Sequence, residues 1–340
     1  MKKLIPIFLF FLFPFFAIGQ EETNQAEAIY NQGILEYNSK NFTAALSSFD
    51  EAIRLKPDFA KAYYNRASVK IELSDKTGAI ADFENAITHD PSMNTAYFGI
   101  AYLHFQGNDY EKAATFFSKA IENGYNGADA YYYRGVIDFE NTDYEKAIED
   151  FSSAIYIDNN YVYAYNDRGS TKRMLEDYNG AISDYERAIE LSDSPASIYN
   201  NLGSAKRKLG NYDAAIEAYN KAVELKSDYF SAYNNRGSAY FHLENYEMAL
   251  KDFDKAISLN PQYAYAYNNK ATALMKLERY EEALQALNIA ISLDSNYAFA
   301  YFNRGSAKEM LRDSEGACAD WKKANELGVE NAAKLIENCE

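Results

Sequence analysis

The chain has 340 residues, 34 of them basic and 50 acidic, and its formal net charge is -16. Nucleic-acid backbones and anionic lipid surfaces are bound by stripes of Lys and Arg, and the sequence has no such stripe. Its two cysteines and three histidines show neither HExxH nor paired-cysteine spacing, and no phosphate-binding loop is present. We therefore expect a non-enzymatic protein without a cofactor or metal, and no nucleic-acid partner.

Residues 1–19 are predicted to be a secretory signal peptide. Two lysines precede an apolar run that Pro6 and Pro14 interrupt, and small residues follow at Ala17 and Gly19, the expected cleavage point. A transmembrane helix needs about 20 apolar residues, so an uncleaved anchor is the less favoured alternative. No cysteine stands at the cleavage point to carry a lipid. We expect an exported protein, periplasmic or extracellular, with no membrane insertion after cleavage.

A 34-residue unit recurs from residue 26 onward, after a short polar lead at 20–25 in which Thr23 or Asn24 can cap the first helix. Each unit holds two short amphipathic segments of helical periodicity, called helix A and helix B below. Counting positions within the unit, position 20 and position 27 are Ala in every copy, and position 8 is Gly or Ala. Neither helix can bury its apolar face alone, so the sequence predicts an all-α solenoid of helix-turn-helix repeats. The nine units are residues 26–59, 60–93, 94–127, 128–161, 162–195, 196–229, 230–263, 264–297 and 298–331.

This pattern resembles the tetratricopeptide repeat family in its period and in its small residues at positions 8, 20 and 27. It also matches the aromatic residues at positions 4, 11, 17 and 24. The Pro at position 32 is the weakest match, because only Pro57, Pro91 and Pro261 keep it. The resemblance implies a right-handed superhelical α-solenoid whose A helices line a concave groove for a protein or peptide partner.

Five units carry Arg at position 7 together with Asp at position 23, and the other four lack both residues. Because the two residues occur together within a unit, we predict that each pair joins helix A to helix B as a structural ion pair. A role of these arginines as ligand contacts is the alternative. The predicted pairs are Arg66 with Asp82, Arg134 with Asp150, Arg168 with Asp184, Arg236 with Asp252, and Arg304 with Asp320.

The resemblance places positions 2, 5, 6, 9, 12 and 13 of helix A in the groove. Aromatic residues dominate there in the first four units and amides in the later ones, which suggests two sub-sites. Amides can bind an extended peptide's main chain, since each offers a donor and an acceptor. The alternatives are that Asn at position 6 is simply common in the family, and that the aromatic residues belong to the core. The carboxylate clamp of chaperone-tail binders is excluded, because position 5 is never Lys and position 6 never Arg. The predicted partner-binding residues are Tyr30, Asn31, Tyr64, Asn65, Tyr132, Tyr133, Asn166, Asp167, Asn200, Asn201, Asn234, Asn235, Asn268, Asn269 and Asn303.

The only two cysteines, Cys318 and Cys339, are predicted to form a disulfide. Residues 332–340 are expected to form a capping helix that covers the last repeat, with a turn around 327–329. In an antiparallel helix pair the two cysteines lie equally far from that turn, and an oxidising compartment permits the bond.

The sequence thus predicts an exported scaffold that holds a peptide or protein segment in its groove. Two alternatives remain: a structural or oligomerising component of a cell-envelope assembly, and a carbohydrate-binding solenoid whose aromatic and amide side chains hold sugars.

Overall fold

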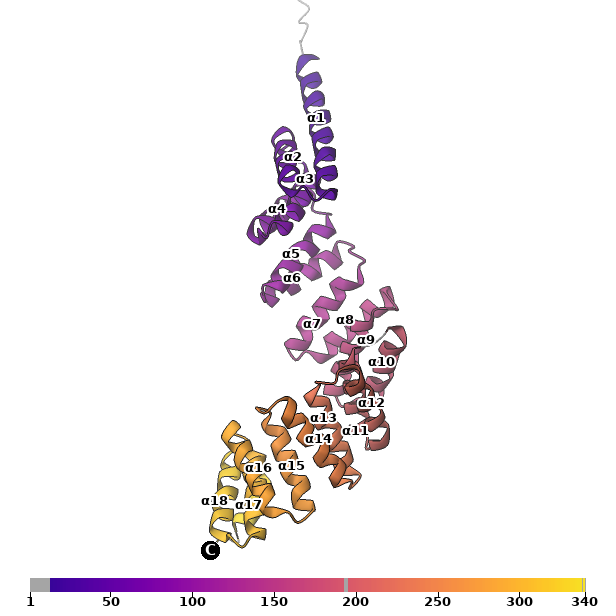
Figure 1. The fold of residues 1–340 in the computed structure, drawn as a ribbon. Helices are drawn as coiled ribbons and strands as arrows, with labels where there is room; N and C mark the ends of the chain where they lie inside the picture. The colour runs from indigo at the N-terminus through magenta and orange to yellow at the C-terminus, as the bar shows by residue number, and fades with distance from the viewer. Residues whose placement is uncertain (1–12, 193–194, 338, 340) are drawn as a thin grey trace, which may run out of the picture. The chain divides into compact units, whose positions relative to one another are not determined.

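The computed structural model describes residues 13–192, 195–337 and 339, and over these residues it contains helices and no strand. The chain divides into two compact units, residues 1–159 and 160–340, and each is described by itself. Both consist of helix pairs in which helix A packs against helix B of its own repeat, and helix B packs against helix A of the following repeat (Figure 1). The predicted all-α solenoid of helix-turn-helix repeats is confirmed.

The first unit contains the first four repeats. From the second repeat onward, helix A begins at position 1 and helix B at position 17. The helices are α1 (Phe13–Asn38), α2 (Phe42–Leu55), α3 (Ala60–Glu72), α4 (Lys76–His89), α5 (Asn94–Gln106), α6 (Tyr110–Glu122), α7 (Ala128–Glu140) and α8 (Tyr144–Ile157).

The second unit contains repeats five to nine and the C-terminal cap. Its helices are α9 (Val162–Met174), α10 (Tyr178–Leu191), α11 (Ala196–Lys208), α12 (Tyr212–Leu225), α13 (Phe230–His242), α14 (Tyr246–Leu259), α15 (Ala264–Lys276), α16 (Tyr280–Leu293), α17 (Ala298–Met310), α18 (Ser314–Glu326), the 3-10 turn η1 (Glu330–Ala332) and α19 (Ala333–Ile336).

The two ends of the chain differ from the sequence-based expectation. Helix α1 begins at Phe13 and runs through residues 20–25, so Thr23 and Asn24 do not cap it. Pro14 does not interrupt it, because proline is tolerated in the first turn of a helix. Residues 1–12 of the predicted signal peptide lie outside the described residues. No helix in the described part of the chain is long and apolar enough to span a bilayer.

The predicted capping helix is shorter than residues 332–340. It consists of η1 and the four residues of α19, with Val329 and Ala332 buried against the last repeat. Leu335 and Ile336 are its last large apolar side chains, so the residues after them have little apolar surface with which to extend the packed helix.

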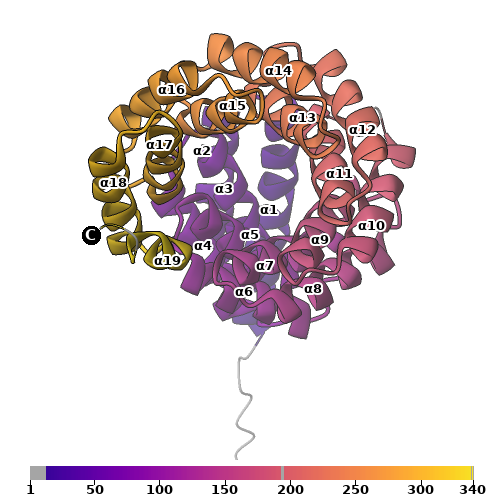
Figure 2. The same cartoon turned by 90° about the horizontal axis from the view of Figure 1, so that it is seen from below.

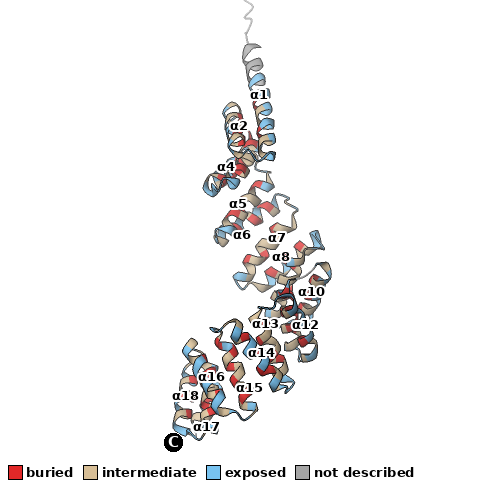
Figure 3. Cartoon of the chain, viewed as in Figure 1, coloured by how far each residue is buried: buried red, intermediate tan, exposed pale blue. Residues whose placement is uncertain are grey.

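The small positions explain how the two helices of a repeat approach each other. The invariant Ala at positions 20 and 27 is at most 1% exposed, as Ala215 and Ala222 illustrate. At position 8 of the sixth repeat, a Cβ added to Gly203 would lie 2.7 Å from the ring of Tyr219 at position 24. Buried residues therefore line the contacts between helices, while intermediate and exposed residues make up the remaining helix surfaces (Figure 3).

Candidate functional site on the A helices

The A helices of residues 160–340 form an inner face. Successive A helices contact one another, as α11 and α13 or α15 and α17 do. In Figure 2, α11, α13, α15 and α17 lie on the inner side of this unit and α12, α14 and α16 on its outer side. We call the surface formed by positions 2, 5, 6, 9, 12 and 13 of these helices the inner face.

An amide ladder joins consecutive repeats on this face. In each rung the Nδ2 of Asn at position 6 donates to the Oδ1 of Asn at position 5 in the preceding repeat. The position-5 residues Asn200, Asn234 and Asn268 are buried, at 5–9% exposure. The four rungs are Asn201 to Asn166 at 3.3 Å, Asn235 to Asn200 at 3.0 Å, Asn269 to Asn234 at 3.0 Å, and Asn303 to Asn268 at 2.8 Å.

The expectation that these position-5 amides face a partner is therefore wrong for Asn200, Asn234 and Asn268. Their side chains point between repeats, where the next A helix covers them and satisfies their carbonyl oxygens. The position-6 amides remain half-buried, but each uses a donor for the ladder. Asn166 is also half-buried, and its Nδ2 donates to Asp167 at 2.8 Å.

Half-buried hydroxyls and exposed aromatic rings make up other positions of the inner face. Position 9 carries a hydroxyl in all five repeats, and Ser204 and Thr272 donate it to the position-5 carbonyl of their own helix. At position 2, Tyr163, Tyr265 and Phe299 are 62%, 53% and 60% exposed. The face thus combines a polar middle with exposed aromatic rings.

A cavity of about 200 Å³ opens between the seventh and eighth repeats. It is lined by the ring of Phe241, by hydroxyls at Ser238 and Thr272, by Asn269 and by His242. The imidazole of His242 stacks on Tyr212 with ring centroids 4.8 Å apart. Burial lowers the pKa of His242, and the charge of Arg207 lowers it further.

The aromatic residues predicted as a sub-site of residues 1–159 pack as part of the core. Tyr30, Tyr64, Tyr132 and Tyr133 are half-buried, and Tyr30 lies against Phe59 with a centroid distance of 4.9 Å. The Tyr30 hydroxyl accepts a hydrogen bond from Asn65 at 2.8 Å. Burial, reinforced by Tyr102, raises the pKa of Tyr133 to about 12. Asn31, by contrast, is exposed.

All five Arg and Asp residues at positions 7 and 23 are paired. In each pair Nε donates to Oδ2 at 2.6–2.9 Å and Nη2 to Oδ1 at 2.6–2.7 Å, and the aspartates are 2–6% exposed. The hydrogen bonds to Asp252 raise the pKa of Arg236 despite partial burial. These arginines are thus bound within the protein.

Sequence reasoning missed a second function of the same guanidinium groups. Nη1 reaches position 25 of the preceding repeat, so one arginine links three helices. These bonds run from Arg66 to Asp50, Arg134 to Ser118, Arg236 to Asn220 and Arg304 to Asn288, at 2.7–3.0 Å.

A second cavity, of about 340 Å³, lies in the first unit beside Arg134 and Asp150. The fourth repeat has Asp138 at position 11, where the second repeat has Lys70. Burial raises the pKa of Asp138, and the charge of Asp150 raises it further. No group of three potential metal ligands occurs among the described residues.

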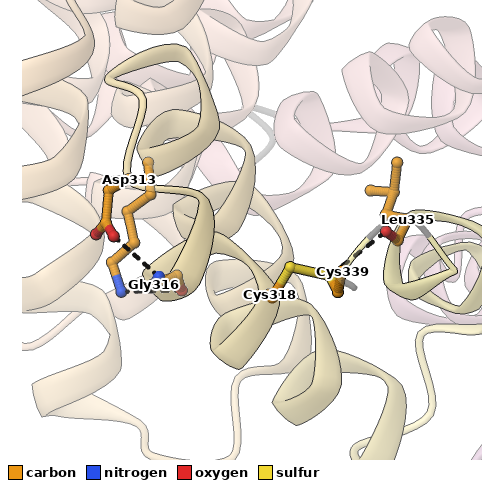
Figure 4. Close-up of a disulfide and its surroundings, with 6 residues drawn as sticks. Asp313, Gly316, Cys318, Leu335 and Cys339 are labelled. Carbon is orange, nitrogen blue, oxygen red and sulfur yellow. Dashed lines mark hydrogen bonds between the residues drawn. A yellow bond between two sulfur atoms is a disulfide. The ribbon is translucent and has the colours of Figure 1, made fainter.

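The predicted disulfide between Cys318 and Cys339 is present, with the two Cα atoms 5.7 Å apart. It ties the segment after α19 to α18 (Figure 4). The Cys339 Sγ also lies 3.6 Å from the Leu335 carbonyl oxygen, one turn earlier.

Sequence models of the tetratricopeptide repeat match residues 30–82, 66–126, 128–161, 162–195, 230–263 and 264–297, and a TPR repeat model matches 203–244. The chain belongs to the tetratricopeptide repeat (TPR) family. Solved TPR structures share its fold. Cut9–Hcn1 of the APC/C is 17% identical, with a TM-score of 0.59, over 92% of this chain and 76% of that one.

The C-terminal part of a TPR protein from Cytophaga hutchinsonii is 21% identical, with a TM-score of 0.56, over 70% of this chain and 98% of that one. Yeast Tom70 is 15% identical, with a TM-score of 0.50, over 94% and 96% of the two chains. No curated protein sequence matches this chain. At these identities, the structural comparisons establish the fold alone.

Proposed function

We propose that this TPR protein is an exported, non-enzymatic scaffold that binds a peptide or protein segment along the inner face of residues 160–340. The observation that carries the proposal is the exposure of the aromatic rings at position 2 beside position-9 hydroxyls and the cavity at His242. Aromatic side chains supply most of the binding energy in many protein interfaces. The amide ladder holds the polar groups of the inner face in place between these aromatic rings.

Export is supported by the apolar N-terminal sequence and by the disulfide, because disulfides persist in oxidising compartments. N-terminal sequencing of the native protein should show a start near Gln20. A retained Met1 in a cytoplasmic fraction would reject export.

The inner face is best tested at residues whose replacement leaves the fold intact. Replacing the Asn residues at position 6 would break the ladder and so disturb folding, whereas Tyr163, Tyr265 and Phe299 are exposed. We expect their joint replacement by Ala to abolish partner capture while the helical content is unchanged.

A photo-crosslinking amino acid reports the binding surface directly. Placed at Ser238 on the inner face, it should label a partner in an envelope extract. Placed at Glu217, which is exposed on the outer helix α12, it should not. Crosslinks from Glu217 alone would favour the second candidate, a structural component. That role is also supported by Tyr156, which is 91% exposed on helix B of the fourth repeat.

A further inference from the structure

Two arginines of the inner face differ from all the other half-buried arginines of the described chain. Seven arginines are half-buried, and five of them bind Asp at position 23. The remaining two, Arg173 and Arg207, occupy position 12 of the fifth and sixth repeats. Neither takes part in an ion pair with another described residue, and the Nε of each is buried without a hydrogen-bond partner.

The surroundings of the two arginines are the same in both repeats. Only these repeats have Tyr at position 24, and the buried Tyr185 and Tyr219 hydroxyls lie 3.1 and 3.2 Å from the position-9 hydroxyls of Ser170 and Ser204. Burial raises the pKa of both tyrosines, and the serine bond and the neighbouring guanidinium oppose this rise. Arg at position 12 and Tyr at position 24 therefore occur together in these two repeats and in no other.

The two units lie in one row. The charge of Arg173 acts on Tyr219 in the next repeat as well as on Tyr185, and the charge of Arg207 acts on His242 in the repeat after that. Lys208, exposed at position 13, adds a further cation at the end of α11. The row thus concentrates positive charge on one part of an otherwise acidic chain.

The carboxylates near Arg173 and Arg207 already interact with other side chains. The lysines that precede the two arginines form ion pairs, Lys172 with Asp184 at 2.8 Å and Lys206 with Glu186 at 3.1 Å. Asp167, whose charge also reaches Tyr185, accepts a hydrogen bond from Asn166. Each guanidinium hydrogen-bonds the neighbouring tyrosine, but neither has a carboxylate partner within the described chain, so its half-buried charge lacks a counter-charge.

We infer that Arg173 and Arg207 recognise carboxylate side chains of an acidic peptide segment bound on the inner face. The inference rests on the proposed function and names the chemistry of its partner. Guanidinium groups bind carboxylates through paired, charge-assisted hydrogen bonds, and a carboxylate held there would supply the counter-charge that the chain lacks.

The test uses the full chain and two fluorescent 12-residue peptides blocked at both ends, one alternating Glu and Ala, the other Gln and Ala. Binding is measured by fluorescence anisotropy at low and moderate salt. We expect the Glu peptide to bind at least tenfold more tightly than the Gln peptide. The R173Q/R207Q variant should remove this difference, while R312Q, which removes an exposed arginine of the last repeat, should retain it.

Two further measurements separate recognition from a structural role. R173Q/R207Q should keep most of the urea midpoint of the parent, because neither arginine forms an ion pair within the described chain and only the hydrogen bonds to Tyr185 and Tyr219 are lost; a loss as large as that of R236Q would overturn the inference. By NMR, the Glu peptide should raise the pKa of His242, since it neutralises Arg207, and the Gln peptide should not.

Equal affinity for the two peptides would overturn the inference but leave the inner face as a peptide site. Binding of inorganic phosphate without discrimination between the peptides would overturn it too, because the site would then recognise small anions. If inner-face crosslinks are absent as well, the proposed function itself fails.

Discussion

The buried pair of Arg236 and Asp252 allows a quantitative test of how the repeats are held together. Asp252 is 4% exposed and accepts two charge-assisted hydrogen bonds, at 2.8 and 2.7 Å. Replacing Arg236 by Leu leaves this carboxylate buried and unpaired, which should cost about 3–4 kcal/mol. Replacing Asp252 by Ala should cost about 2 kcal/mol, because the guanidinium keeps its hydrogen bond to Asn220 and can bind water.

The chain supplies its own reference for the double variant. The sixth repeat has Leu202 and Ala218 at the same two positions, so R236L/D252A reproduces a combination that this fold already accepts. We expect it to cost about 1 kcal/mol, chiefly from the lost contact of Arg236 with Tyr233. The coupling energy of the pair is then about 4–5 kcal/mol.

The matched control is the pair of Arg279 and Glu282. Its two hydrogen bonds are equally short, at 2.7 Å each, but its side chains are 43% and 54% exposed. Its coupling should be much smaller than that of the buried pair, because solvent screens exposed charges. The free energies of unfolding are measured by urea titration, monitored by circular dichroism, and by hydrogen exchange of the α13 and α14 amides. Equal coupling in the two cycles would refute the reasoning that burial decides the strength.

Three further predictions concern the C-terminal cap, the turn at Thr142 and the carboxylate of Asp138. Replacing Cys318 and Cys339 by Ser should destabilise the cap by about 3 kcal/mol and speed hydrogen exchange in η1 and α19; unchanged exchange would contradict this. Thr142 is β-branched at φ +62°, so T142G should stabilise the fourth repeat by about 1 kcal/mol in urea unfolding, and a loss would count against strain. The folded state raises the pKa of Asp138 and so favours its protonated form, a stabilisation that is full below pH 4 and lost as pH rises. D138N should therefore stabilise the protein above pH 5 and have no effect near pH 3, which melts at both pH values can check.

Much of the fold could be predicted because the same information recurs in every repeat. A small residue at position 8 and Ala at positions 20 and 27 specify close helix pairs in any one copy, and nine copies remove the ambiguity. The ion pairs could be predicted for a related reason. Both partners lie within one repeat, so the presence of Arg236 with Asp252, and the loss of both in the sixth repeat, identified the contact.

The amide ladder escaped prediction because its partners belong to different repeats. Within a single repeat, Asn234 and Asn235 are adjacent in sequence and are predicted to lie on the same surface. In the structure Asn234 accepts from Asn269, and Asn235 donates to Asn200, each 35 residues away. A comparison of position 5 with position 6 of the following repeat would have found this signal, and a comparison of position 12 with position 24 would have found Arg173 and Arg207.

The length of the cap could not be predicted for another physical reason. Its few apolar residues specify contact with the last repeat but not how far a helix continues beyond them. Cys339 lies after α19 and not on a long helix, so the disulfide forms although the equal-length helix pair that suggested it is absent.

The position of the ladder also bears on where a partner binds. Gly99 stands at position 6 of the third repeat and cannot form a rung, whereas from Asn201 to Asn303 every repeat forms one. On another part of the same helices, Arg236 and Arg304 bind position 25 of the preceding repeat. Neighbouring repeats of residues 160–340 are therefore held by two separate sets of polar contacts. A surface fixed in this way loses little conformational entropy when it binds an extended segment. The exposed rings and the two arginines without an ion pair lie on this part of the chain, which is why we place the partner there.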